Sequence, residues 1–257
     1  MLLLQQFFKK WWAQLIVIVI SCGVLLIFKD QNIIAGGDSF HYLDFGNLFE
    51  SLSSTWNPKE NLGNVNLALS RLAPMVAFWK ALDLMQIPIW LIQRFWMLVL
   101  SLSAGLGLFY LVINLFRKRT TLVQIGAIIA SMLYLYNMFI VNDPVQVNSR
   151  LILAILPWIL LLWMKGLNKE KFDFRFSLWI GIISLLMASS ASNIASIAVV
   201  PIILGCYFVY HVATKPKTFK RSLVFALATI ANCLLFNLWW ITTSLVFMTQ
   251  SSQDVSQ

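Results

Sequence analysis

Long apolar runs recur along the whole chain and constrain its fold more than any other feature. Each is long enough, or nearly so, to cross the hydrocarbon core of a membrane as a helix. The runs cover residues 12–28, 88–115, 121–141, 149–164, 176–192, 193–213 and 222–248. Only 11% of the residues are charged, whereas a soluble domain carries about 25%. We therefore predict an all-α, polytopic helical membrane protein with about seven transmembrane helices.

The charges between the runs predict how these helices are oriented. The formal net charge is +9, but the basic residues form short clusters between apolar runs, which is typical of topology signals and argues against nucleic-acid binding. If the N-terminus is cytoplasmic, most of the 19 basic residues and only a few of the 10 acidic ones lie inside. The positive-inside rule therefore predicts a cytoplasmic N-terminus. The first run is long for a signal peptide and no small-residue cleavage site follows it, which predicts a retained signal anchor. We expect the protein in the plasma (inner) membrane.

The first connection, residues 29–87, is predicted to be a long outer loop, and loops of this length are usually functional. Its segment LALSRLAPMVAFWKALDLM (67–85) is apolar but contains charges and a proline. We predict an interfacial or re-entrant helix there, because a further span would send the later basic loops outward. Residues 39–53 predict an amphipathic helix, since apolar side chains recur at helical spacing. They are Phe45, Leu48, Phe49 and Leu52.

Two neighbouring runs, 176–192 and 193–213, contain no Lys, Arg, Asp or Glu and are separated by the sequence SSASN. This pattern predicts a tight helical hairpin. Polar residues inside the later runs predict helix–helix contacts rather than ligand sites. They are Ser184, Ser189, Ser190, Asn193, Ser196, Asn232 and Asn237.

The stretch AGGDSFHYLDF (35–45) holds the first candidate site. Asp38 lies near the outer interface, where a carboxylate in a low-dielectric setting is suited to take a proton. Asp38 is also suited to cap a helix, since Gly-Gly-Asp-Ser is good helix-start chemistry. His41 and Asp44 follow at helical spacing, but a single His is weak support for a metal site. We expect no metal there.

Basic residues at the predicted outer interface form a second candidate site. Each could keep its head group in water while its stem stays in lipid. Alternatively, they bind a lipid-linked phosphate, for which guanidinium is well suited. These residues are Arg71, Lys80, Arg94 and Arg150. Asp143 is a further polar residue of the outer face, in the turn sequence Asn-Asp-Pro.

Several stretches resemble a known family. They are STWNPKENLGNVNLALSRLAPMVAFWKAL (54–82), IPIWLIQRFWMLVLSLSAGLGLFYL (87–111), ASNIASIAVVP (191–201) and NLWWITTSL (237–245). Together with a long outer loop that carries an early Asp, they resemble the GT-C superfamily of polyprenyl-phosphate-dependent glycosyltransferases. The similarity is to the N-terminal membrane domain of α-(1→3)-arabinofuranosyltransferases and covers about residues 30–248.

The resemblance implies that a sugar, arabinofuranose in this family, moves from a polyprenyl-phosphate donor to a cell-envelope glycan on the outer face. Asp38 would be the catalytic base, with Asp44 secondary, and the outer basic residues would hold the donor phosphate. His41 has no counterpart in the family. No cofactor is implied, and a divalent metal requirement is left open.

Residues 1–257 are expected to form one GT-C-like transmembrane domain, as a fragment of a longer protein. The alternatives are a transporter or flippase of lipid-linked sugars, and a non-catalytic membrane scaffold.

Overall fold

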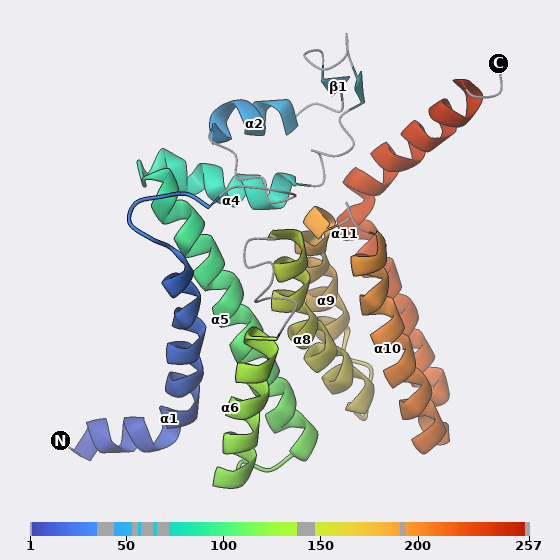
Figure 1. Ribbon diagram of the computed structural model, residues 1–257. Coiled ribbons are helices and arrows are strands. Elements are labelled where there is room, and N and C mark those ends of the chain that lie inside the picture. The colour runs from blue at the N-terminus through green and yellow to red at the C-terminus, as the bar shows by residue number, and fades with distance from the viewer. Residues whose placement is uncertain are drawn as a thin grey trace. The chain divides into compact units, whose positions relative to one another are not determined.

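The computed structural model describes residues 2–34, 44–52, 56–57, 64–65, 72–137, 147–190 and 194–254, and these are almost entirely helical (Figure 1). The helices are α1 (Leu2–Cys22), η1 (Gly23–Ile27), α2 (Phe45–Leu52), α4 (Ala73–Leu84), α5 (Ile89–Phe116), α6 (Thr121–Leu135), α8 (Val147–Asn168), α9 (Phe174–Met187), η2 (Ala188–Ser190), α10 (Ile194–Thr214), η3 (Pro216–Thr218) and α11 (Phe219–Asp254). Within these ranges, the extended pairing comprises β1 (Trp56–Asn57) and β2 (Asn64–Val65), which are antiparallel. The predicted all-α class is confirmed.

Five of the described helices are long and apolar enough to cross a membrane. Their spans are Lys10–Ile27, Ile89–Phe116, Arg150–Asn168, Ile197–Thr214 and Pro216–Leu245. The apolar helices α6 and α9 are shorter and coincide with the two remaining runs of the sequence. The chain is thus an integral membrane protein, while the total of seven spans stays a prediction.

The chain divides into two compact units, which are described separately. The first unit comprises residues 1–41 and 89–161, and the second comprises residues 42–88 and 162–257. In the first unit, α1, α5 and α6 pack side by side (Figure 1). Their shared core is formed by fully buried residues: Ala13, Val17, Phe109 and Ala127. The hydroxyl of Ser131 on α6 lies 3.0 Å from the carbonyl oxygen of Gly105 on α5 and joins these two helices.

A proline inside α8 explains a hydrogen bond between α6 and α8 in the first unit. Pro157 has no N–H group, so the carbonyl of Leu153, four residues earlier, has no partner within the helix. The hydroxyl of Tyr134 on α6 donates a hydrogen bond to that carbonyl oxygen at 2.9 Å. One turn further on, the indole Nε1 of Trp158 donates to the carbonyl oxygen of Ser103 on α5 at 2.9 Å. The proline therefore ties α8 to α6, because in lipid a free carbonyl finds no water.

In the second unit, α9 packs mainly against α11 and not against α10. The prediction that residues 176–192 and 193–213 pack against each other as a tight hairpin is therefore wrong. Asn232 of α11 donates to the hydroxyl of Ser177 at 2.7 Å, and Asn237 donates to that of Ser184 at 2.8 Å. Apolar surfaces give helices little preference for one another over lipid, so these buried polar pairs select the partner.

The predicted role of the polar residues is confirmed for Ser184, Asn232 and Asn237. Ser189 is buried, with 1% of its surface exposed. The side chains of Ser190, Asn193 and Ser196 lie outside the described part of the chain.

Replacing Tyr134 with Phe is expected to destabilise the protein by about 1–2 kcal/mol, because the Leu153 carbonyl is left buried without a partner. In a Pro157→Ala background the helix regains an N–H group for that carbonyl, so the same Tyr134→Phe change should cost much less. Thermal unfolding of the four proteins in detergent measures the coupling. Equal losses in both backgrounds would contradict the assigned role of Tyr134.

Candidate functional site

The structure describes four of the eight residues that the sequence singles out. Asp44 and Lys80 belong to the second unit, and Arg94 and Arg150 belong to the first. The other four, Asp38, His41, Arg71 and Asp143, lie outside the described residues. The alternative roles of Asp38 as a base or a helix cap are therefore open on structural grounds.

The helices α2 and α4 of the predicted outer loop pack against each other. Phe45 and Trp79 are almost fully buried, and their ring centroids are 5.6 Å apart. Leu48, Leu52, Met75 and Val76 complete the buried face. The predicted amphipathic pattern is thus confirmed at three positions, whereas Phe49 remains 40% exposed. At 12 residues, α4 is about 18 Å long and too short to cross a hydrocarbon core of about 30 Å.

A charged cluster lies on this pair of helices. The ammonium group of Lys80 forms a salt bridge with Asp83 at 3.0 Å. A Cβ atom placed on Gly46 would lie 3.3 Å from both the Asp44 Oδ1 and the Lys80 Nζ atoms. These two atoms are therefore separated by no more than the sum of those distances. Because Gly46 has no side chain, the Asp44 carboxylate and the Lys80 ammonium can approach each other beside it.

Asp44 stands directly before α2, and its carbonyl oxygen accepts a hydrogen bond from the backbone N–H of Leu48 at 3.2 Å. Its side chain is exposed. Lys80 forms a salt bridge with Asp83 and lies near the Asp44 carboxylate. Its predicted role as a phosphate ligand would require the incoming phosphate to compete with Asp83.

In the first unit, Arg94 contacts the segment that follows α1. Its guanidinium lies 4.7 Å from the ring centroid of Trp90 and 5.3 Å from that of Phe28. Its Nη2 atom donates a hydrogen bond to the carbonyl oxygen of Asp30. Asp30 has a φ of 47°, in the left-handed region that Asp tolerates better than most residues. Arg94 thus supports this turn, in addition to carrying a positive charge.

Sequence reasoning missed the neighbouring residue, Gln93. Its side-chain amide binds the backbone of Ile34 twice, accepting from the N–H group at 3.0 Å and donating to the carbonyl at 2.7 Å. Gln93 is only 3% exposed. A Gln in the first turns of an apolar helix was the available signal, since a buried amide requires hydrogen-bond partners.

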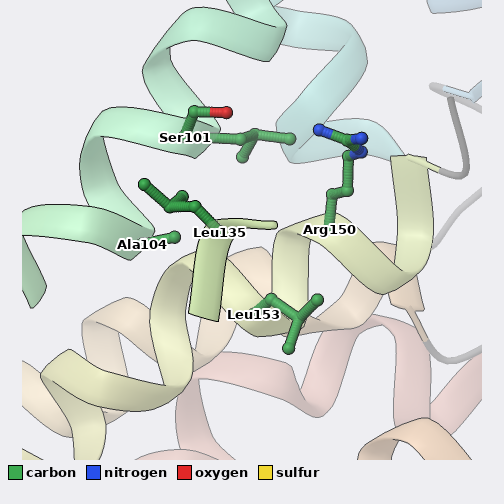
Figure 2. A pocket seen from close by; sticks show the side chains of 6 residues that line it. Ser101, Ala104, Leu135, Arg150 and Leu153 are labelled. Atoms are coloured by element: carbon green, nitrogen blue, oxygen red, sulfur yellow. The ribbon is translucent and has the colours of Figure 1, made fainter. Parts of the chain in front are cut away.

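Arg150 lines a cavity of about 20 Å³ in the first unit, which is room for about one water molecule. Only 9% of its surface is exposed. Figure 2 shows that Ser101 of α5 and Arg150 of α8 extend toward the same space, with Leu135 and Leu153 along its wall. A guanidinium and a hydroxyl in apolar surroundings can bind one anionic oxygen strongly, because little water competes for it.

Arg94 and this cavity lie along one stripe of α5. Arg94 and Ser101 are seven residues apart, so they face the same side of the helix about 10 Å from each other. The first unit thus places two guanidinium-bearing residues next to one face of α5. An elongated anion could contact this face at two points.

The sequence analysis expects no metal at Asp38, His41 and Asp44, and of these three the structure describes only Asp44. Among the described residues, no three His, Cys, Asp or Glu side chains come together as metal ligands would.

The chain was compared with known proteins. A family described as "Alpha-(1->3)-arabinofuranosyltransferase, N-terminal GT-C domain" matches residues 44–255. No curated protein and no solved structure matches the chain. The matched range includes α2, α4 and all the helices from α5 to α11, and it begins at Asp44.

Replacing Trp79 with Ala is expected to destabilise the pair of helices α2 and α4 by about 3–5 kcal/mol, because a fully buried ring is lost. Faster protease cleavage between residues 45 and 84, measured on the membrane-embedded protein, would show this. Met85→Ala is the matched control, since Met85 is 70% exposed at the end of the same helix. Equal cleavage of both variants would contradict the assigned packing.

Proposed function

Because the chain belongs to the family of α-(1→3)-arabinofuranosyltransferase N-terminal GT-C domains, a family of glycosyltransferases, we propose that it transfers arabinofuranose from a polyprenyl-phosphate donor to a hydroxyl of a cell-envelope glycan. The family match over residues 44–255 carries this proposal. Transfer takes place on the outer face of the plasma membrane, because the positive-inside rule directs the loop of residues 29–87 outward.

The proposed reaction is a direct displacement at the anomeric carbon. Asp38 accepts the proton of the acceptor hydroxyl, and the oxygen of that hydroxyl forms a new bond to the anomeric carbon. The bond from this carbon to the phosphate oxygen breaks, and its electron pair leaves with the polyprenyl phosphate. The configuration of the sugar is inverted. Asp44 is a secondary carboxylate at the other end of the same segment, and its position beside Lys80 keeps a positive charge close to it.

Arg150 is a second proposed donor-phosphate ligand. It lines an apolar cavity with the Ser101 hydroxyl that has room for a single oxygen atom of the donor phosphate, and a guanidinium suits a phosphate oxygen. Arg94 would contribute from the same face of α5, although one of its nitrogens already binds Asp30. Lys80 is less suited, since it forms a salt bridge with Asp83. Arg71 is proposed from the sequence alone.

Replacing Asp38 with Asn is expected to lower kcat by about 10²–10⁴-fold, because the base is lost. The assay is transfer of radiolabelled arabinofuranose from the polyprenyl-phosphate donor by the full-length protein in membranes. Asp173→Asn is the control, since Asp173 caps α9 through a 3.1 Å hydrogen bond and Asn caps equally well. Unchanged transfer by the Asp38 variant would remove Asp38 as the base.

Replacing Arg150 with Met is expected to raise the KM for the donor by about 10–100-fold, which corresponds to the loss of a charged hydrogen bond of about 1.5–3 kcal/mol. Met fills a similar volume without leaving a buried charge, so the protein should fold. Arg175→Met is the control, because Arg175 is exposed and is predicted to be cytoplasmic. A change in the KM for the acceptor alone would contradict the phosphate-binding role.

A further inference from the structure

The side chain of Gln93 clamps the backbone of Ile34. The clamp comprises a 3.0 Å hydrogen bond from the Ile34 N–H to Oε1 and a 2.7 Å hydrogen bond from Nε2 to the Ile34 carbonyl oxygen. Ile34 lies in no helix or strand. The amide of Gln93 therefore provides the donor and acceptor that a neighbouring strand would otherwise provide. Both hydrogen bonds are partly buried, and Gln93 itself is 3% exposed.

Arg94 holds the same segment four residues earlier in the chain. It donates a hydrogen bond to the carbonyl oxygen of Asp30 and lies against the rings of Phe28 and Trp90. Two consecutive side chains of α5 thus bind the backbone of residues 28–34 at two points. The left-handed conformation of Asp30 costs free energy and persists only where the surroundings hold it. The segment is therefore anchored by specific contacts and not by apolar packing alone.

The anchored segment leads directly to the proposed base. Asp38 follows Ile34 by four residues, so the length of the chain keeps their Cα atoms within about 14 Å of each other. If Gln93 released Ile34, this reach would no longer be measured from a point fixed on α5, and the position of the carboxylate relative to α5 would be less restricted. A base that is misplaced by about 1 Å can lose a large part of its effect on the rate.

We propose that Gln93 is a positioning residue for sugar transfer. It holds the start of the first outer loop and thereby keeps the catalytic carboxylate at the acceptor hydroxyl, without touching either substrate. This inference rests on the proposed function, since it requires that Asp38 acts as the base. It assigns to Gln93, at the beginning of α5, a role that is distinct from donor binding.

The test compares Gln93→Leu with the wild type in the full-length, membrane-embedded protein. Leu has a similar size and removes both hydrogen bonds, so kcat should fall by about 10–100-fold while the KM for the donor changes less than about twofold. Hydrogen exchange of the Ile34 amide should accelerate at the same time. Gln124→Leu is the matched control, because Gln124 lies on α6 of the same unit and donates its described hydrogen bond to the backbone carbonyl oxygen of Arg119, just before that helix.

A second variant, Gln93→Glu, gives a readout that a purely structural role would not change. A protonated carboxyl can accept from the Ile34 N–H and donate to its carbonyl, as Gln does, whereas an ionised carboxylate repels the carbonyl oxygen. The kcat of this variant relative to the wild type should therefore rise as the pH falls. This variant also serves if Gln93→Leu fails to fold.

Different outcomes separate this inference from the proposed function. Faster exchange at Ile34 with an unchanged kcat would overturn the positioning role. A raised donor KM with an unchanged kcat would overturn it as well, because Gln93 would then bind the donor. If Asp38→Asn leaves transfer intact, Asp38 is not the base. A loss of kcat in Gln93→Leu could then not be attributed to a misplaced Asp38, and the positioning role would be overturned together with the proposed base.

Discussion

The polar groups that membrane helices must satisfy internally organise this structure. Lipid offers neither donors nor acceptors, so a backbone carbonyl freed by a proline needs a partner from a neighbouring helix. At Pro157 the hydroxyl of Tyr134 is that partner. In the second unit the amides of Asn232 and Asn237 bind serines of α9. Such pairs decide which helices pack together, because apolar surfaces are satisfied almost equally by lipid.

Buried polar groups also find partners in the loop of residues 29–87, which is predicted to lie outside. Its beginning is bound by Gln93 in the first unit, and its helix α2 is packed on α4 in the second. The proposed base, Asp38, comes between Ile34 and α2 in the sequence. A long loop can carry a catalytic group only if it is supported in this way, since the free energy of ordering it must come from other contacts.

The basic residues that were predicted to bind phosphate differ in the contacts that their surroundings give them. Lys80 forms a salt bridge with Asp83 and lies near Asp44, so an anion would have to compete with Asp83 for its ammonium group. Arg94 supports a turn through the Asp30 carbonyl. Arg150 lines a cavity together with a hydroxyl. The sequence shows only that each is a basic residue near the predicted outer interface, which is why it cannot distinguish among them.

The sequence by itself determined the membrane class, the order and approximate positions of the apolar helices, most of the amphipathic face of α2, and the family. These properties follow from composition and local periodicity, which each segment carries independently of the others. Only the tertiary structure decided that α9 pairs with α11, that Tyr134 completes the helix interrupted by Pro157, and that Gln93 binds Ile34. Those contacts join residues far apart in the chain, and their energies depend on distance, direction and exclusion of water, none of which can be read from spacing along the sequence.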